Sequence, residues 1–352
     1  MPGRRDPWLD NAKAILVILV VVGHAIVLLP YGDPKSRVYD FLYYFHIPAF
    51  VLVSGYLSRT FAWTPRHLTA LVTTLVVPYV VFEWLMAAFR VYVVGQPSSM
   101  EVLQPLWLNP HWPMWYLVAL ALWRLATPLL VRHWLMVPAA VAVSLAAGEV
   151  DLELLDLNRV LGLLPFFVIG LHLPRRALEL LQARWTGLAG LAVLAGIWWL
   201  AARTDDHWST QWLYYRSSYD TLGASWGEGA EIRAQLILVG LAGTAAVLTL
   251  VPRRRSLLTA VGTYTMGVYL LHGFAIRYAG AQDVSHWLPG NGWTSVAITV
   301  AAAVALALFL GWPPVARRLL WLVDPVNQLL SLRGRARRGP AAPEDRSAPS
   351  SG

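Results

Sequence analysis

This chain of 352 residues consists of long apolar runs separated by short polar segments. About 20 mostly apolar residues form a helix long enough to cross the roughly 30 Å hydrocarbon core of a bilayer. Charged residues make up only 14% of the chain, whereas a soluble domain carries about 25%. A soluble domain and a disordered chain are therefore excluded. The net charge of +8 does not indicate a nucleic-acid partner, because the basic residues stand in short clusters between the apolar runs.

The apolar runs predict an all-α integral membrane protein, a bundle of about ten transmembrane helices. The fifth and sixth runs are short and contain proline, so nine or eleven helices remain open. The runs lie at residues 14–30, 41–57, 68–89, 112–131, 133–148, 157–173, 185–202, 233–251, 260–277 and 294–312.

The basic residues between the runs predict the orientation. If the N-terminus lies inside, 19 of the 28 lysines and arginines fall in segments on the inner side and 7 on the outer side. Lysine and arginine concentrate in cytoplasmic loops, so both termini are expected in the cytoplasm, with the chain in a plasma (inner) membrane. Residues 1–325 form the predicted membrane domain. Residues 326–352 are basic and rich in Pro, Ala and Ser, and we expect a disordered cytoplasmic tail there.

The outer segments are instead acidic and aromatic. Four carboxylates lie in residues 149–159, and residues 203–231 combine Asp205 and Asp206 with several tryptophans and tyrosines. Aromatic faces and carboxylates suit the apolar C–H faces and the hydroxyls of a sugar. Tryptophan and tyrosine also gather at any membrane interface, so an interfacial aromatic belt remains the alternative.

The first apolar run carries the most informative polar residues, in the sequence DNAKAILVILVVVGHAI. Lys13 and His24 are eleven residues apart, which is about three helical turns, so they share one face roughly 16 Å apart along the axis. Asp10 lies one turn before Lys13. Ionisable groups inside a span are costly and usually functional. A neutral imidazole can take up a proton near pH 7, so His24 is a candidate general base, with a packed core histidine as the alternative.

Other polar or aromatic residues of the runs are weaker candidates, because each also has an ordinary structural explanation as an interface anchor or a snorkelling cation. They are His46, Ser54 and Tyr56 in the second run, Glu83 in the third, Trp115 and Arg124 in the fourth, and Tyr269 and His272 in the ninth. The chain has no cysteine, HExxH motif or P-loop. We therefore expect no metal, no thiolate chemistry and no ATP-driven transport.

Several of these segments together resemble membrane acyltransferase family 3, and within it the fucose 4-O-acetylase-like acetyltransferases. The segments are the first-run sequence above, FHIPAFVLVSGYL, VVPY, HWPMWYLVAL, FFVIGLHL and YTMGVYLLH. The resemblance implies transfer of an acyl group from acetyl-CoA, or another acyl-CoA, to a hydroxyl of a sugar or glycan. It also implies that Lys13 and His24 are the family's essential pair. An R-x-x-R pair of the family is incomplete, because Arg66 is present but Thr69 replaces the second arginine.

The reaction that the resemblance implies suggests a role for each candidate. His24 would be the general base, with Ser54, Tyr56 or Tyr269 stabilising the oxyanion. Asp10, Lys13, Arg66 and Arg124 would bind the CoA donor, and His46, Glu83, Trp115, Tyr269 and His272 would contact the carbohydrate acceptor. Direct transfer is favoured because no activated nucleophile stands out, although a relay through an acylated residue remains open.

Two other classes of function are weighed against this one. A secondary transporter or flippase could use His24 in a proton relay, but transporters of this size usually show two related halves, which the sequence lacks. A catalytically inactive sensor or polymer-export partner is the third possibility. The acyl group, the acceptor and the oligomeric state are not predicted.

Overall fold

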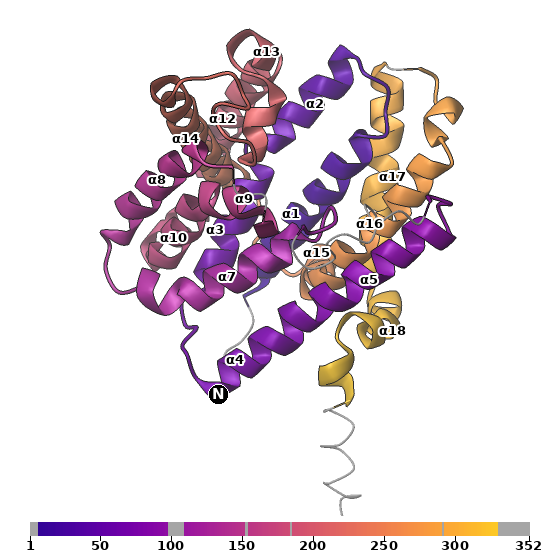
Figure 1. The fold of residues 1–352 in the computed structure, drawn as a ribbon, viewed down its shortest axis with the longest axis horizontal. Coiled ribbons are helices and arrows are strands. Elements are labelled where there is room, and N and C mark those ends of the chain that lie inside the picture. Colours follow the sequence, from indigo (N-terminus) through magenta and orange to yellow (C-terminus); the bar gives the residue numbers. More distant parts are fainter. Residues whose placement is uncertain (1–5, 98–108, 152–153, 184, 291, 330–352) are drawn as a thin grey trace, which may run out of the picture.

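The fold is helical throughout the residues that the computed structural model describes, which are 6–97, 109–151, 154–183, 185–290 and 292–329; no strand occurs among them (Figure 1). Most of the predicted tail, residues 330–352, lies outside the described residues. The α-helices are α1 (Pro7–Ile26), α2 (Asp33–Tyr43), α3 (His46–Ser58), α4 (Pro65–Leu71), α5 (Val77–Tyr92), α7 (Trp115–Leu130), α8 (Met136–Ala146), α9 (Leu157–Gly162), α10 (Leu164–His172), α11 (Arg175–Leu181), α12 (Thr186–Ala201), α13 (Thr204–His207), α14 (Trp226–Thr249), α15 (Leu257–Thr263), α16 (Thr265–Ala281), α17 (Trp293–Gly311) and α18 (Pro313–Val323). A π-helical turn (Val72–Val76) joins α4 to α5, and 3₁₀ turns lie at Ala147–Glu149, Leu154–Asp156, Thr210–Tyr214 and Val284–Trp287.

Every one of the ten predicted apolar runs overlaps at least one helix, but fewer than ten helical segments of the described residues are by themselves long and apolar enough to cross a membrane. Five helical segments of the described chain are long and apolar enough to cross a bilayer, and up to seven if each of two bent helix pairs counts as one span. These pairs are Leu154–Gly162 with Leu164–His172, bent by 55°, and Arg175–Leu181 with Thr186–Ala201, bent by 80°. The structure therefore supports a multi-pass membrane protein, and the count of about ten stays a prediction.

Helix α1 begins seven residues before the predicted first run, for a local reason. The side chain of Asp6 accepts a hydrogen bond from the Trp8 backbone N–H at 2.9 Å, and Pro7 occupies the first helical position. A capping carboxylate followed by proline is a strong helix start. As a result Asp10 and Lys13 stand on regular helix that continues to His24.

Helix α1 lies in the middle of the bundle, where it packs against α3, α15, α16 and α17 (Figure 1). Asn11 fixes its first turns to the segment before α15. The Asn11 amide donates to the carbonyl oxygens of Pro252 and Arg254 at 2.8 and 2.9 Å, and its oxygen accepts from Thr259 Oγ1 at 2.7 Å. The start of α1 therefore shares one end of the bundle with the Arg253–Arg255 cluster, as the charge pattern predicts.

Helices α3 and α10 approach each other at two glycines. A Cβ atom placed on Gly55 would lie 2.1 Å from the carbonyl oxygen of Phe167, and one placed on Gly170 would lie 2.1 Å from that of Leu52. Small residues let helix backbones pack this closely in membrane proteins. The pair forms a rigid wall beside α1, to which α3 also packs.

Replacing Gly170 with alanine should destabilise the protein, because α3 and α10 would have to separate to admit the methyl group. We expect a loss of about 1–3 kcal/mol in the free energy of unfolding, the usual cost of overpacking. Thermal unfolding of the purified protein in detergent measures it. Gly196→Ala in α12 is the matched control, because a Cβ there meets nothing within 4 Å. Equal melting temperatures for the two variants would contradict the close approach.

Candidate active site

A cavity of about 900 Å³ enters the bundle at the end opposite the Arg253–Arg255 cluster, and His24 lies in its wall. The lining comes from the ends of α1 and α16, from α2, from the starts of α3 and α7, and from α9 and the segment 211–221. The polar and aromatic side chains among the lining residues are His24, Tyr39, Tyr43, Gln96, Trp112, Trp115, Asp151, Asp156, Arg159, Gln211, Tyr214, Arg216, Ser217, Thr221 and Arg277. These segments all belong to the side predicted to face outward.

His24 is joined to His272 of α16 by a short hydrogen bond. The distance from His24 Nδ1 to His272 Nε2 is 2.8 Å, and His272 Nδ1 lies 3.0 Å from the carbonyl oxygen of Val268. A carbonyl oxygen can only accept, so His272 Nδ1 carries the hydrogen and Nε2 of a neutral ring has only a lone pair. That lone pair must accept from His24 Nδ1–H. His24 Nε2 is therefore left without a hydrogen. Among the described residues it has no hydrogen-bond partner, and it is not one of their unpaired atoms that solvent cannot reach.

The segment before α7 covers the imidazole of His24. The ring of Trp112 lies 4.2 Å from that of His24, centroid to centroid. Both neighbours of Trp112 are held in place. Glu83 of α5 accepts from the His111 backbone N–H at 2.9 Å and contacts His111 Nδ1 at 2.5 Å.

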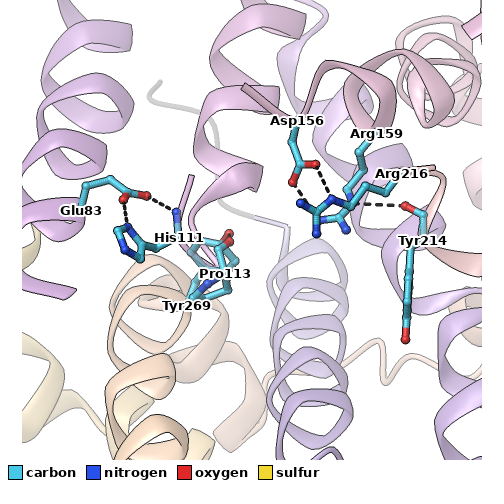
Figure 2. Close-up of polar contacts among 8 residues, drawn as sticks. All are labelled: Glu83, His111, Pro113, Asp156, Arg159, Tyr214, Arg216 and Tyr269. Carbon is cyan, nitrogen blue, oxygen red and sulfur yellow. Dashed lines mark hydrogen bonds and ion pairs between the residues drawn. The ribbon is translucent and has the colours of Figure 1, made fainter. Parts of the chain in front are cut away.

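On the other side of Trp112, the hydroxyl of Tyr269 donates to the carbonyl oxygen of Pro113. Figure 2 shows both the contact of Glu83 with His111 and the approach of Tyr269 to Pro113. The oxygens of Glu83 and the hydroxyl hydrogen of Tyr269 are thus occupied within the protein, and the two side chains hold Trp112 against His24.

Arginine and tyrosine side chains form the opposite part of the cavity wall. Asp156 contacts both Arg159, at 3.2 Å from Nη1, and Arg216, at 3.3 Å from Nε (Figure 2). Arg159 Nε donates to the carbonyl oxygen of Tyr214 at 3.2 Å. Burial raises the pKa of the Tyr214 hydroxyl above its ordinary value, so the group stays protonated. It lies 2.8 Å from the hydroxyl of Tyr39.

The remaining sequence candidates lie away from the lining of this cavity. Lys13 Nζ forms an ion pair with Asp10 at 2.8 Å, near the start of α1, and its side chain is 25% exposed. Two other candidates are bonded to neighbouring helices. Ser54 Oγ lies 2.6 Å from the Tyr116 hydroxyl, and Arg124 Nε donates to Ser58.

Tyr56 and Arg66 are two further candidates that do not line the cavity. The Tyr56 hydroxyl accepts from Arg59 at 2.7 Å, and the Arg59 guanidinium lies over the same ring. Arg66 is exposed on α4. Arg124 and Lys13 therefore have different partners in the described part of the chain.

His46 is buried beside the first helix. Its Nδ1 lies 2.7 Å from the carbonyl oxygen of Leu42, and its Nε2 has no hydrogen-bond partner. Because a Cβ on Gly23 would lie 3.7 Å from that nitrogen, the absence of a side chain at Gly23 brings α1 close to it. Within the described residues, no three His, Asp or Glu side chains are grouped so as to hold a metal ion.

The structure therefore brings together part of the predicted site. His24 and Trp115 line the cavity, while His272 and Tyr269 stand directly behind this wall. The sequence assigns no individual role to Trp112, Arg159 or Arg216 of this wall. The signal for them was general, namely their place on the outer, acidic and aromatic side, where a sugar-binding surface was one of two interpretations.

An apolar helical bundle with a buried histidine pair behind a polar cavity defines a multi-pass membrane protein with a candidate acid–base site. The chain belongs to the acyltransferase family Acyl_transf_3, described as an Acyltransferase domain, which matches residues 6–312. The protein is therefore a membrane acyltransferase, as the resemblance implied.

Two curated relatives are similar to the chain. It is 25% identical over 348 residues to the nodulation protein NolL of Sinorhizobium fredii, a match that covers 92% of this chain and 90% of the relative. It is 41% identical over 58 residues to the nodulation protein NolL of Mesorhizobium japonicum, over 15% of this chain and 16% of the relative. No solved structure matches the chain significantly.

Proposed function

We propose that this membrane acyltransferase moves an acyl group, acetyl in the simplest case, from acyl-CoA to a hydroxyl of a carbohydrate bound in the cavity, with His24 as general base. The observation that carries the proposal is the free lone pair of His24 Nε2. The hydrogen bond from His24 to His272 leaves this nitrogen as a proton acceptor in the wall of the cavity. A positioned base of this kind typically contributes about 10²–10⁴ in rate.

The reaction would proceed by direct transfer. His24 Nε2 takes the proton from an acceptor hydroxyl, and the oxygen attacks the carbonyl carbon of the thioester. The tetrahedral intermediate then collapses with cleavage of the C–S bond, and the CoA sulfur recovers the proton from His24. During the step His272 accepts from His24 Nδ1–H and so keeps the imidazole in the tautomer that the reaction needs.

The acyl donor would approach from the Lys13 end of α1. The positive-inside pattern puts this end on the cytoplasmic side, where acyl-CoA is made. Lys13 would bind a CoA phosphate as a point charge, and Asp10 would orient it through their 2.8 Å ion pair.

Three further candidates fit the path of the donor better than the reaction centre. Arg124 bonds to Ser58, Ser54 to Tyr116, and Tyr56 to Arg59. Because neither Ser54 nor Tyr56 lines the cavity, we propose that they contact the pantetheine arm of the donor, and their role as oxyanion donors stays a prediction. Arg66, exposed on α4, would add to the positive potential at its entrance.

The test is release of CoA thiol by the purified protein in the presence of acyl-CoA and carbohydrate acceptors. Because the chain has no cysteine, a thiol-reactive dye reports free CoA without background from the protein. Lys13→Ala should raise the Kd for CoA about tenfold, the loss expected for one hydrogen bond to a charged group. Lys13→Arg should bind CoA nearly as the native protein does, since the charge and the reach survive.

The other lysine of the chain, Lys35, provides the matched control, because it lies at the opposite end, in α2. Lys35→Ala should leave CoA affinity unchanged. Equal CoA affinity of Lys13→Ala and Lys35→Ala would remove the donor site from Lys13. A native protein that bound no acyl-CoA would contradict the proposed function as a whole.

A further inference from the structure

Arg159 is a largely buried cation whose charge is only partly balanced by the protein. Its side chain is 14% exposed, and its guanidinium lies 4.6 Å from the centre of the Trp115 ring. Within the described residues the guanidinium donates twice, from Nε to Tyr214 and from Nη1 to Asp156. The Nη2 group makes no hydrogen bond there, so both of its N–H groups are available in the cavity wall.

The carboxylate of Asp156 cannot balance Arg159 by itself, because Arg216 shares it. Asp156 Oδ2 contacts Arg159 and Oδ1 contacts Arg216, whose side chain is 60% exposed at the cavity wall. Figure 2 shows both guanidinium groups in contact with the one carboxylate. This cluster therefore carries one positive charge more than it has negative charge.

The rest of the cavity lining does not remove the excess. Arg277 adds a third guanidinium and Asp151 a second carboxylate, so the ionisable lining keeps a surplus of one cation with His24 neutral. A buried cation is stable only when it is paired and hydrogen-bonded. The unused donors of Arg159 thus face a space in which an anion would complete the arrangement.

We propose that Arg159 and Arg216 form a subsite for an anionic oxygen group, a carboxylate or a phosphate, carried by the carbohydrate acceptor. The inference rests on the proposed function, since it makes the cavity the acceptor site. The planar guanidinium presents parallel N–H donors that match the two oxygens of such a group. The Trp115 ring beneath Arg159 holds the guanidinium in place and offers an apolar face beside it.

This subsite gives the acceptor a direction within the cavity. An anionic group held by Arg159 and Arg216 anchors one part of the glycan against α9 and the 211–221 segment, and a hydroxyl of the same glycan is presented to His24 across the cavity. The class of acceptor is then an acidic sugar or a glycan that carries a phosphate, and neutral sugars are poorer ligands.

The test measures binding to the full-length protein in detergent, without any acyl donor. The probes are methyl glucuronide for the carboxylate, glucose 1-phosphate for the phosphate, and methyl glucoside as the neutral sugar. We expect at least one anionic probe to bind about tenfold more tightly than methyl glucoside, the gain typical of a hydrogen bond to a charged group. The preferred anionic probe identifies the group, and added salt should weaken this preference.

Arg216→Gln is the informative variant, because the side chain is exposed enough to be replaced without unfolding the protein. It should reduce the preference for the anionic probe to about twofold. Arg203→Gln is its matched control, since Arg203 is an exposed arginine on the same side that stacks on Trp199 and does not line the cavity. It should keep the native preference.

Equal binding of all three probes by the native protein would overturn the inference, and so would an unchanged preference in Arg216→Gln. Both results leave the proposed function standing if CoA thiol is still released with a neutral acceptor. Conversely, a preference that depends on Arg216 in a protein that transfers no acyl group would support the subsite and contradict the proposed function.

Discussion

Replacement of His24 by glutamine should lower the rate of acyl transfer by about 10³-fold, within the range typical for loss of a general base. Glutamine keeps the size and polarity of the side chain, and its amide reaches the position of His24 Nε2, which faces the cavity, rather than that of Nδ1, which contacts His272. What glutamine lacks is a basic nitrogen facing the cavity. The chemistry should therefore fail although the packing survives, and His24→Ala should be as inactive.

Measurement of CoA affinity and of thiol release on the same preparations separates an effect on donor binding from an effect on the chemical step. We expect His24→Gln to bind CoA within a few-fold of the native protein and to melt at a similar temperature, because the donor site lies at the other end of α1. A His24→Gln variant that still turned over at about a tenth of the native rate would exclude His24 as the base, since such a loss is below the usual effect.

Replacement of His272 by leucine should lower the rate of acyl transfer by about 10²-fold. His272 does not line the cavity, so it acts through His24, whose hydrogen it accepts. Loss of the residue that holds a catalytic histidine in its tautomer costs about 10⁴ in a serine protease triad, where the partner is an aspartate. A neutral imidazole stabilises the imidazolium less than an aspartate does, so the smaller effect is expected.

A conservative variant distinguishes positioning from simple packing. His272→Gln can place its amide oxygen near the present position of Nε2 and accept from His24 Nδ1–H, so it should recover activity to within about tenfold of the native rate. Because the bond acts on the chemical step, the leucine variant should change kcat and leave the KM for acyl-CoA nearly unchanged. If leucine and glutamine had equal activities, the tautomer argument would be wrong.

The sequence predicts those parts of the site that depend on a single helix. His24 stands out because an ionisable residue inside an apolar run is costly wherever the helix packs, and its spacing from Lys13 follows from regular helical geometry. The start of α1 was predicted later than the structure has it, because hydropathy does not register the cap that Asp6 and Pro7 provide.

The contacts between helices could not be predicted in the same way. His24 and His272 are separated by 248 positions, and nothing near either residue indicates that they meet. Glu83 illustrates the same limit. Its type suggested contact with a sugar, but in the structure its oxygens hold His111, 28 positions away, so that Trp112 lies against His24.

Span counting from the sequence is limited by helix geometry. The run at 157–173 is long enough to cross a bilayer if it is straight, but Leu154–Gly162 and Leu164–His172 are bent by 55°. Arg159, in the first helix of this bent pair, lies in the cavity wall. A single apolar run can thus contribute both a packing helix, α10, and part of a binding site.

The cavity is lined by segments at one end of the bundle, including residues 211–221, and the positive-inside pattern predicts that this end faces away from the cytoplasm. A glycan assembled in the cytoplasm would therefore meet His24 only after it had been carried across the membrane, so acylation would follow export in the order of biosynthesis. Coenzyme A would remain in the cytoplasm, and only the acyl group would leave. The protein would then connect two compartments by passing a few atoms across the bilayer, without itself carrying either substrate across.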